Sequence, residues 1–112
     1  MEKPPRWIAR VWEGSTRASD GEAYLDVLRR TGFPGYRETP GNRGVLAFRR
    51  VGPTEARFLL LTLWESEEAI RAFAGKDPTR AVFYPEDDRF LIRRGEEVRH
   101  FEWVHGEGLV WR

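Results

Sequence analysis

One stretch of the chain decides the fold: Ala56-Arg57-Phe58-Leu59-Leu60-Leu61-Thr62-Leu63-Trp64. Its composition is typical of a β-strand, in which successive side chains point to opposite faces of the sheet. Apolar side chains then fall on both faces, with Phe58, Leu60 and Trp64 on one and Leu59, Leu61 and Leu63 on the other. A sheet face exposed to water alternates polar with apolar residues, so this pattern predicts a strand covered on both sides.

The preceding stretch, residues 43–51, predicts a second strand with the same two-sided pattern. Val45 and Ala47 fall on one face, and Leu46 and Phe48 on the other. A short turn connects this strand to the next one, which favours an antiparallel hairpin.

Two amphipathic helices are predicted on either side of this hairpin. Ser66 is a suitable N-cap for a helix that ends at Gly75. Earlier in the chain, Ser19 and Glu22 have the spacing of a capping box, and apolar positions with helical periodicity continue to Thr31.

The remaining segments complete the chain. Residues 6–13 predict a first strand and residues 98–104 a last one. Residues 33–41 are dense in Gly and Pro and predict a loop. The Asp-Pro pair at 77–78 predicts a short helix, and the polar run at 84–89 leaves room for one more helical turn.

The predicted order is strand, helix, strand, strand, helix, strand, which is the ferredoxin-like βαββαβ arrangement of the α+β class with a four-stranded antiparallel sheet. Two helices cover only one face of such a sheet. Because both faces are apolar, we expect a second copy of the chain to cover the other face, giving a homodimer with sheets packed face to face.

Composition excludes several classes of protein. The 112 residues suit one domain, predicted at 1–104 with a tail at 105–112. The absence of Cys excludes disulfides, thiolate metal sites and thiol chemistry. A net charge of +1 argues against a dedicated nucleic-acid binder. No apolar run approaches the roughly 20 residues of a membrane span, and the start lacks a signal-peptide pattern, so we expect a cytoplasmic protein. The scarcity of Asn, Gln, Cys and Met fits a thermophile, although the Arg excess fits a GC-rich genome equally well.

The segment at 61–73, Leu-Thr-Leu-Trp-Glu-Ser-Glu-Glu-Ala-Ile-Arg-Ala-Phe, resembles the antibiotic biosynthesis monooxygenase family. In that family a strand ends in Trp, a Ser-Glu-Glu type cap follows, and the helix carries an Ala-Phe pair. The resemblance continues through 80–87 and 98–102. It implies a dimeric α+β barrel. Family members include cofactor-independent quinone-forming oxygenases, heme-degrading enzymes, a quinol monooxygenase, and small proteins with no assigned reaction.

The resemblance does not extend to the residues of the heme-degrading branch. There, the strand-ending Trp is joined by an Asn on the first strand and by an iron-ligating His on the second helix. Trp64 matches, but the first strand holds no Asn and residues 67–74 hold no His. Iron would then lack an axial ligand, so we expect no heme and no other cofactor. The two His and scattered carboxylates have no usual ligand spacing, so we expect no metal site either.

His100 and Tyr84 are the candidate catalytic residues. His100 lies in the last predicted strand, where a neutral imidazole could act as a base, or could equally form an ordinary cross-strand contact with Glu102. Tyr84 precedes an acidic run close to where the family places its pocket mouth. Its phenol could donate a hydrogen bond to a substrate oxygen, or simply pack over the end of the second helix.

Three further residues are candidates for substrate binding. Trp64 could stack on an aromatic ring, and Phe73 could line the same pocket, although both fit a structural core equally well. Arg43 could bind an anionic substrate, or be one of many solvated surface charges. The leading hypothesis is a monooxygenase-like protein that acts on a small aromatic or quinol without a cofactor. Its rival is a non-enzymatic protein of the same fold that binds a small hydrophobic ligand or has an accessory role.

Overall fold

The two-sided apolar stretch forms the centre of the sheet in the computed structural model, which describes residues 6–109. It is strand β3 (Glu55–Trp64), flanked by β2 (Asn42–Val51) and by β1 (Ile8–Arg17), both antiparallel to it. Two short strands, β4 (Leu91–Arg94) and β5 (Arg99–Glu102), pair with the other edge of β1. The order is therefore β2-β3-β1, with β4 and β5 sharing the last place.

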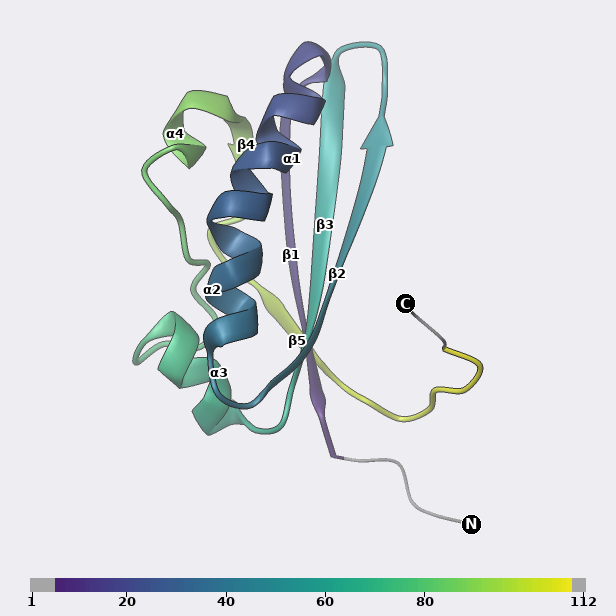
Figure 1. Cartoon of the computed structure of the whole chain (residues 1–112), viewed down its shortest axis with the longest axis vertical. Helices are drawn as coiled ribbons and strands as arrows, with labels where there is room; N and C mark the ends of the chain where they lie inside the picture. Colours follow the sequence, from purple (N-terminus) through teal and green to yellow (C-terminus); the bar gives the residue numbers. More distant parts are fainter. Residues whose placement is uncertain (1–5, 110–112) are drawn as a thin grey trace.

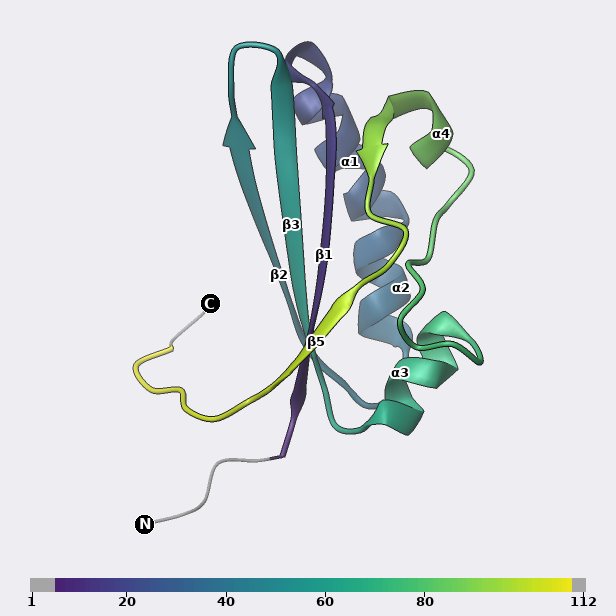
Figure 2. The same ribbon diagram turned by 180° about the vertical axis from the view of Figure 1, so that it is seen from behind.

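The helices lie on one face of this sheet (Figures 1 and 2). A 3-10 turn, η1 (Ala18–Asp20), leads into α1 (Gly21–Arg30) and α2 (Gly32–Glu38), and α3 (Glu67–Ala74) follows β3. A single turn, α4 (Asp87–Phe90), precedes β4. Among residues 6–109, no helix is long and apolar enough to cross a membrane.

This architecture confirms the predicted α+β class and the ferredoxin-like strand and helix order. The predicted last strand at 98–104 is shorter, and β4 forms an additional strand that the sequence did not indicate. Strands β4 and β5 are separate because the chain between them stops pairing with β1. Gly95 N–H still donates to the Glu13 carbonyl at 3.0 Å, and Glu97 then pairs with Arg80 instead.

Three local predictions were wrong. Residues 33–41 are mostly helical, because Tyr36 of α2 packs against Trp64 and this burial outweighs the Gly and Pro content of the segment. The side chain of Ser19 makes no capping bond to α1, which begins after a 3-10 turn. Asp77 caps a turn at Thr79 and starts no helix.

Other local signals are confirmed. The Ser66 hydroxyl accepts a hydrogen bond from Ala69 N–H at 3.1 Å, and α3 ends at Gly75, whose φ of 94° favours glycine. The first strand continues past Gly14 to Arg17. Gly14 is required there, because the indole of Trp12 lies over it and leaves no space for a Cβ.

The core fills the space between the sheet and the helices. Even-numbered residues of β3 face this side, and α1, α2 and α3 pack their apolar faces on them. Among its fully buried members are Tyr24, Val27, Phe58, Trp64 and Ile70.

The opposite side of the sheet, which we call the outer face, carries no helix of the described chain (Figure 2). Register places apolar residues of four strands together on it: Ala9, Val11, Leu46, Phe48, Leu59, Leu61, Leu63 and Phe101. Phe48 is 53% exposed, and Leu46 and Phe101 are also exposed. Charged residues flank this apolar centre, including the Glu13–Arg99 ion pair at 2.7 Å.

Candidate functional site

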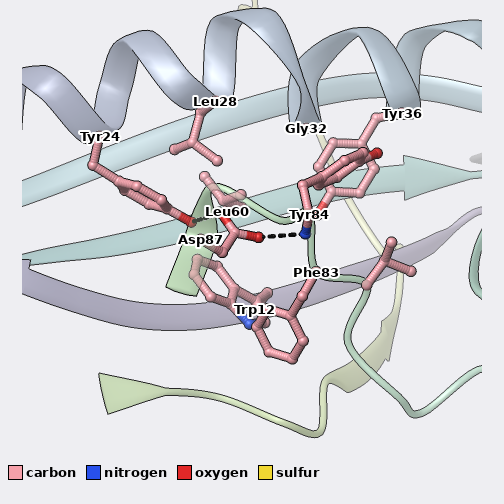
Figure 3. A pocket seen from close by; sticks show the side chains of 10 residues that line it. Trp12, Tyr24, Leu28, Gly32, Tyr36, Leu60, Phe83, Tyr84 and Asp87 are labelled. Carbon is pink, nitrogen blue, oxygen red and sulfur yellow. Dashed lines mark hydrogen bonds between the residues drawn. The ribbon is translucent and has the colours of Figure 1, made fainter. Parts of the chain in front are cut away.

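A small cavity lies between the sheet and the helices, where α1 and α2 meet the segment at 82–87 (Figure 3). We call it the inner cavity. Its volume is about 20 Å³, enough for one water molecule. Aromatic side chains and one carboxylate dominate its wall, which includes Trp12, Tyr24, Leu28, Tyr36, Tyr84 and Asp87.

The carboxylate of Asp87 is the most unusual group in this wall, because it is buried with a residue exposure of only 3%. The hydroxyl of Tyr24, itself buried, donates to Asp87 Oδ1 at 3.0 Å, and the backbone N–H of Tyr84 donates to Oδ2 at 2.7 Å (Figure 3). Each carboxylate oxygen keeps a further lone pair. Asp87 can therefore accept a proton or a hydrogen bond from a molecule in the cavity.

The three tyrosines of the cavity stay protonated at neutral pH. Burial and then the charge of Asp87 raise the pKa of Tyr24 far above its ordinary value. Burial raises the pKa of Tyr36 to about 12, although the nearby Arg10 opposes this shift. Burial, followed by the charge of Asp87, also raises the pKa of Tyr84. Their hydroxyls therefore act as hydrogen-bond donors and not as bases.

Tyr84 is the one predicted catalytic residue that lines the inner cavity. Its hydroxyl lies against Gly35 of α2, in space that a Cβ at this position would fill. Phe73 of α3 contacts the same place, so Tyr84 also packs near the end of that helix. The hydroxyl makes no hydrogen bond within residues 6–109, which leaves it free to donate to a ligand.

His100 lies in a different cavity, which we call the edge cavity. This open hollow of about 350 Å³ lies between β5 and α3 and is lined by Ile8, Glu67, Ile70, His100, Phe101 and Glu102. The Nε2 atom of His100 is buried and has no hydrogen-bond partner in the described chain. Burial, together with the positive charge of Arg10, lowers the pKa of His100, while Glu67 opposes the shift. The imidazole is therefore neutral at pH 7.

Trp64 and Phe73 form an aromatic cluster with Tyr36. The ring centroids of Trp64 and Phe73 are 5.6 Å apart, and those of Tyr36 and Phe73 are 4.6 Å apart. Trp64 is fully buried, and its Nε1–H donates to Thr62 Oγ1 at 2.8 Å. Neither Trp64 nor Phe73 lines the inner or the edge cavity, so they support the inner cavity from behind Tyr36.

Arg43 lies on the surface of β2 and lines neither of the two cavities. It forms an ion pair with Glu65, and its guanidinium carbon is 5.6 Å from the ring centroid of Trp7. Half of its side chain is exposed.

The structure thus separates the predicted residues and adds two that the sequence did not single out, Asp87 and Tyr24. Tyr24 could have been noticed as a hydroxyl on the apolar side of a predicted helix. Asp87 gave no such signal, because it lies in an acidic run that normally faces solvent. No group of three His, Cys, Asp or Glu residues within 6–109 is placed to hold a metal ion.

Comparison with known proteins establishes the fold. No protein-family model and no curated protein sequence matches the chain. Among solved structures, a protein of unknown function from Nitrosomonas europaea superposes with a TM-score of 0.67 at 14% identity, over 95% of this chain and 97% of that one. A putative antibiotic biosynthesis monooxygenase from Bacillus cereus superposes with a TM-score of 0.50 at 14% identity, over 95% of this chain and 99% of that one.

A monooxygenase from Streptomyces coelicolor, solved with the ligand nanaomycin D, superposes with a TM-score of 0.54 at 17% identity, over 96% of this chain and 94% of that one. The chain therefore shares its fold with one structure described as a putative antibiotic biosynthesis monooxygenase and one described as a monooxygenase, as the resemblance of residues 61–73 implied. At these identities the similarity concerns the fold, and fold alone does not define an activity.

Proposed function

We propose that the protein is a homodimeric, monooxygenase-like protein that oxidises a small aromatic or quinol substrate in the inner cavity without a prosthetic group. The observation that carries this proposal is the buried Asp87–Tyr24 pair in a wall of aromatic side chains. A buried carboxylate beside an apolar cavity is an arrangement typical of acid–base sites. The shared fold with two structures described as monooxygenases supports the same class of activity.

The reaction needs no external reductant. When an anthrone is oxidised by dioxygen to an anthraquinone, one oxygen atom enters the product and the other leaves as water. The substrate supplies all the electrons, and it does so most readily after a proton has been removed. In this proposal Asp87 accepts that proton, while the hydroxyl of Tyr84 donates to the substrate oxygen.

A substrate ring needs more room than the closed inner cavity offers. Most of its wall belongs to strands and helices, whereas residues 82–84 have no regular secondary structure. Val82 and Phe83 can move outward at the lowest cost, because the backbone of Tyr84 donates to Asp87 Oδ2 at 2.7 Å and accepts from Asp87 N–H at 2.9 Å. Entry of the substrate therefore proceeds by displacement of this segment.

A non-enzymatic role in binding a small hydrophobic ligand is the second candidate. The observation that favours it is the edge cavity, whose volume of about 350 Å³ falls in the range of ordinary ligand pockets. Ile8, Ile70 and Phe101 would contact the apolar part of the ligand. His100, whose Nε2 has no partner, would accept or donate one hydrogen bond.

Oxygen uptake tests the enzymatic proposal. The wild-type protein is incubated in air with a panel of hydroquinones and anthrones and compared with Asp87→Asn, Tyr84→Phe and His100→Gln. We expect uptake with at least one substrate and a loss of roughly 10²- to 10⁴-fold in Asp87→Asn. Asp88→Asn is the matched control, because Asp88 is adjacent but exposed and pairs with Arg94 at 2.6 Å.

Each outcome separates the candidates. Uptake that survives in Asp87→Asn but not in His100→Gln would move the reaction to the edge cavity. Binding of a panel compound without any uptake would support the ligand-binding role instead. Uptake equal in all variants would contradict the assignment of these residues.

The homodimer is proposed on the outer face. Its apolar centre, with Phe48 53% exposed, is a surface that soluble monomers rarely leave uncovered. A two-fold arrangement would pack the outer faces of two copies against each other and shield this centre on both. Light scattering at micromolar concentration is expected to give twice the chain mass of 13.1 kDa. A mass near that of one chain would contradict the proposal.

A further inference from the structure

Arg10 is a buried cation in the centre of the molecule. It lies on the helix side of β1, where its residue exposure is 2%. Two residues before it on the same side, Ile8 lines the edge cavity, and two residues after it, Trp12 lines the inner cavity. Arg10 therefore lies between residues that line the two cavities, although its own side chain is in the lining of neither.

The guanidinium of Arg10 is incompletely satisfied. Its Nη2 donates to the Arg80 carbonyl at 2.7 Å, while its Nε is buried and has no hydrogen-bond partner among residues 6–109. Its guanidinium carbon lies 5.5 Å from the ring centroid of Phe73. No carboxylate among residues 6–109 forms an ion pair with it. Several other arginines of this chain, by contrast, form ion pairs with Asp or Glu at the surface.

An unpaired charge of this kind disfavours folding, because the charge loses its hydration without gaining a counter-charge. The charge of Arg10 also shifts the pKa values of two neighbouring side chains. The positive charge of Arg10 holds down the pKa of Tyr36, which lines the inner cavity, and that of His100, which lines the edge cavity. Arg10 therefore acts electrostatically on one group in the lining of each cavity.

We propose that Arg10 binds the negative charge of a ligand, and that the ligand of the inner cavity is an aromatic anion. This inference rests on the proposed function only in placing the ligand in the inner cavity. Asp87 lies in the wall of the same cavity and repels a second negative charge, so the anionic group is oriented toward Tyr36 and Arg10. The Tyr36 hydroxyl is the donor at that end.

An ionised phenol and an aromatic carboxylate share this chemistry, and the experiment separates them. Calorimetry measures the binding of 4-nitrophenol, benzoate and benzyl alcohol to the wild-type protein, to Arg10→Met and to Arg10→Lys. Arg99→Met is the matched control, since Arg99 lies near His100 on β5 but is exposed and paired with Glu13.

We expect the wild-type protein to bind at least one of the two anions, and Arg10→Met to bind that anion roughly tenfold to a hundredfold more weakly. Benzyl alcohol, which is neutral, should bind the wild-type protein and Arg10→Met equally. Preference for benzoate would assign a carboxylate, and preference for nitrophenolate, followed by its visible absorbance, would assign an ionised phenol. Equal binding of the anions by the wild-type protein and Arg10→Met would overturn the inference.

The pKa of His100, measured by nuclear magnetic resonance, is a second test. If Arg10 had only a structural role, adding a ligand would leave this pKa unchanged. Arg10 lowers the pKa of His100, while Glu67 raises it and Glu102 lines the same cavity. Binding of an anion at Arg10 should therefore raise the pKa of His100, and Arg10→Met should raise it without ligand. A pKa that stays constant when benzoate or nitrophenolate binds would contradict the inference.

These measurements require no turnover, so they are independent of oxygen uptake. Arg10→Met removes an unpaired buried charge and should fold at least as stably as the wild-type protein, as judged by urea unfolding. If it does not fold, Arg10→Lys decides, because it keeps the charge but loses the planar donors and should bind the anion with intermediate affinity. If a neutral substrate gave oxygen uptake that was unchanged in Arg10→Lys, the proposed function would stand. The inference that Arg10 binds an anionic ligand would then be overturned.

Discussion

The two faces of the sheet are built from the same strands but differ in what covers them. On the helix side, Trp64, Phe58 and Tyr24 are almost completely buried. On the outer face, Leu46 and Phe48 are equally apolar but exposed. The same strands thus present one apolar face that the helices cover and one that no helix of the described chain covers.

The difference also separates stability from assembly. Buried aromatics on the helix side contribute to the folding of each chain, whereas the exposed residues Leu46, Phe48 and Phe101 of the outer face would lose their contact with water only in the proposed dimer. Substitutions on the two faces should therefore change different measured quantities.

The largest effect is expected from a charge on the outer face. Phe48→Glu would place a carboxylate in the proposed interface twice, once from each copy, at roughly 3–5 kcal/mol for each unpaired buried charge. Light scattering should then give the mass of one chain with the circular dichroism of a folded protein. Arg49→Gln, on the opposite side of β2, is the control and should keep the dimer mass. A dimer that survives Phe48→Glu would show that the outer face is not the interface.

On the helix side, Trp64→Ala should lower the free energy of unfolding by about 3–5 kcal/mol, because a fully buried indole is replaced by a cavity. Urea unfolding of the monomeric Phe48→Glu background, with and without Trp64→Ala, measures this loss without a contribution from association. A change below about 1 kcal/mol would mean that the covered face is less tightly packed than the structure indicates.

A smaller loss is expected at the inner cavity. Tyr24→Phe removes the hydroxyl that donates to Asp87 and should cost about 1–3 kcal/mol, since the carboxylate stays buried with one donor fewer. Tyr84→Phe is the control in the same urea experiment, because its hydroxyl has no partner in the described chain, and it should change stability by about 0.5 kcal/mol or less. Equal losses would remove the distinction between the two tyrosines.

The smallest effect concerns pH. The pKa of His100 is lowered in the folded chain, so near and below about pH 6.5 the unfolded chain binds a proton that the folded chain does not. Stability should therefore fall as the pH is lowered from about 6.5 through the pKa of folded His100. His100→Gln should flatten this dependence in thermal unfolding, whereas His105→Gln, in the exposed tail, should leave it unchanged. A steeper dependence in His100→Gln would reverse the sign of the argument.

The elements that the sequence predicted correctly depend on local signals. Strand β3 follows from a run of strand-forming residues that is apolar on both faces, and α3 from the Ser66 cap and the Gly75 end. By contrast, α2 forms in a segment rich in Gly and Pro because Tyr36 gains burial against Trp64, which is distant in the sequence. Such tertiary gains have no local pattern and cannot be read from the segment itself.

The candidate site was predictable only in part for the same reason. Tyr84 was predicted because it precedes an acidic run close to where the resembled family places its pocket mouth. Asp87 was not, because its burial depends on a contact with Tyr24, 63 positions earlier. Arg10 was one of many arginines in the sequence, and only the register of β1 places it in the core.

The two edges of the sheet have a consequence for solubility. At one edge β2 is ten residues long and carries Arg43, Arg49 and Arg50. At the other, β4 and β5 are only four residues each and are interrupted between them. Charged side chains at one edge and short, broken strands at the other both hinder the addition of a further strand. The chain can thus carry an apolar sheet face for pairing while its edges resist growth into fibrils.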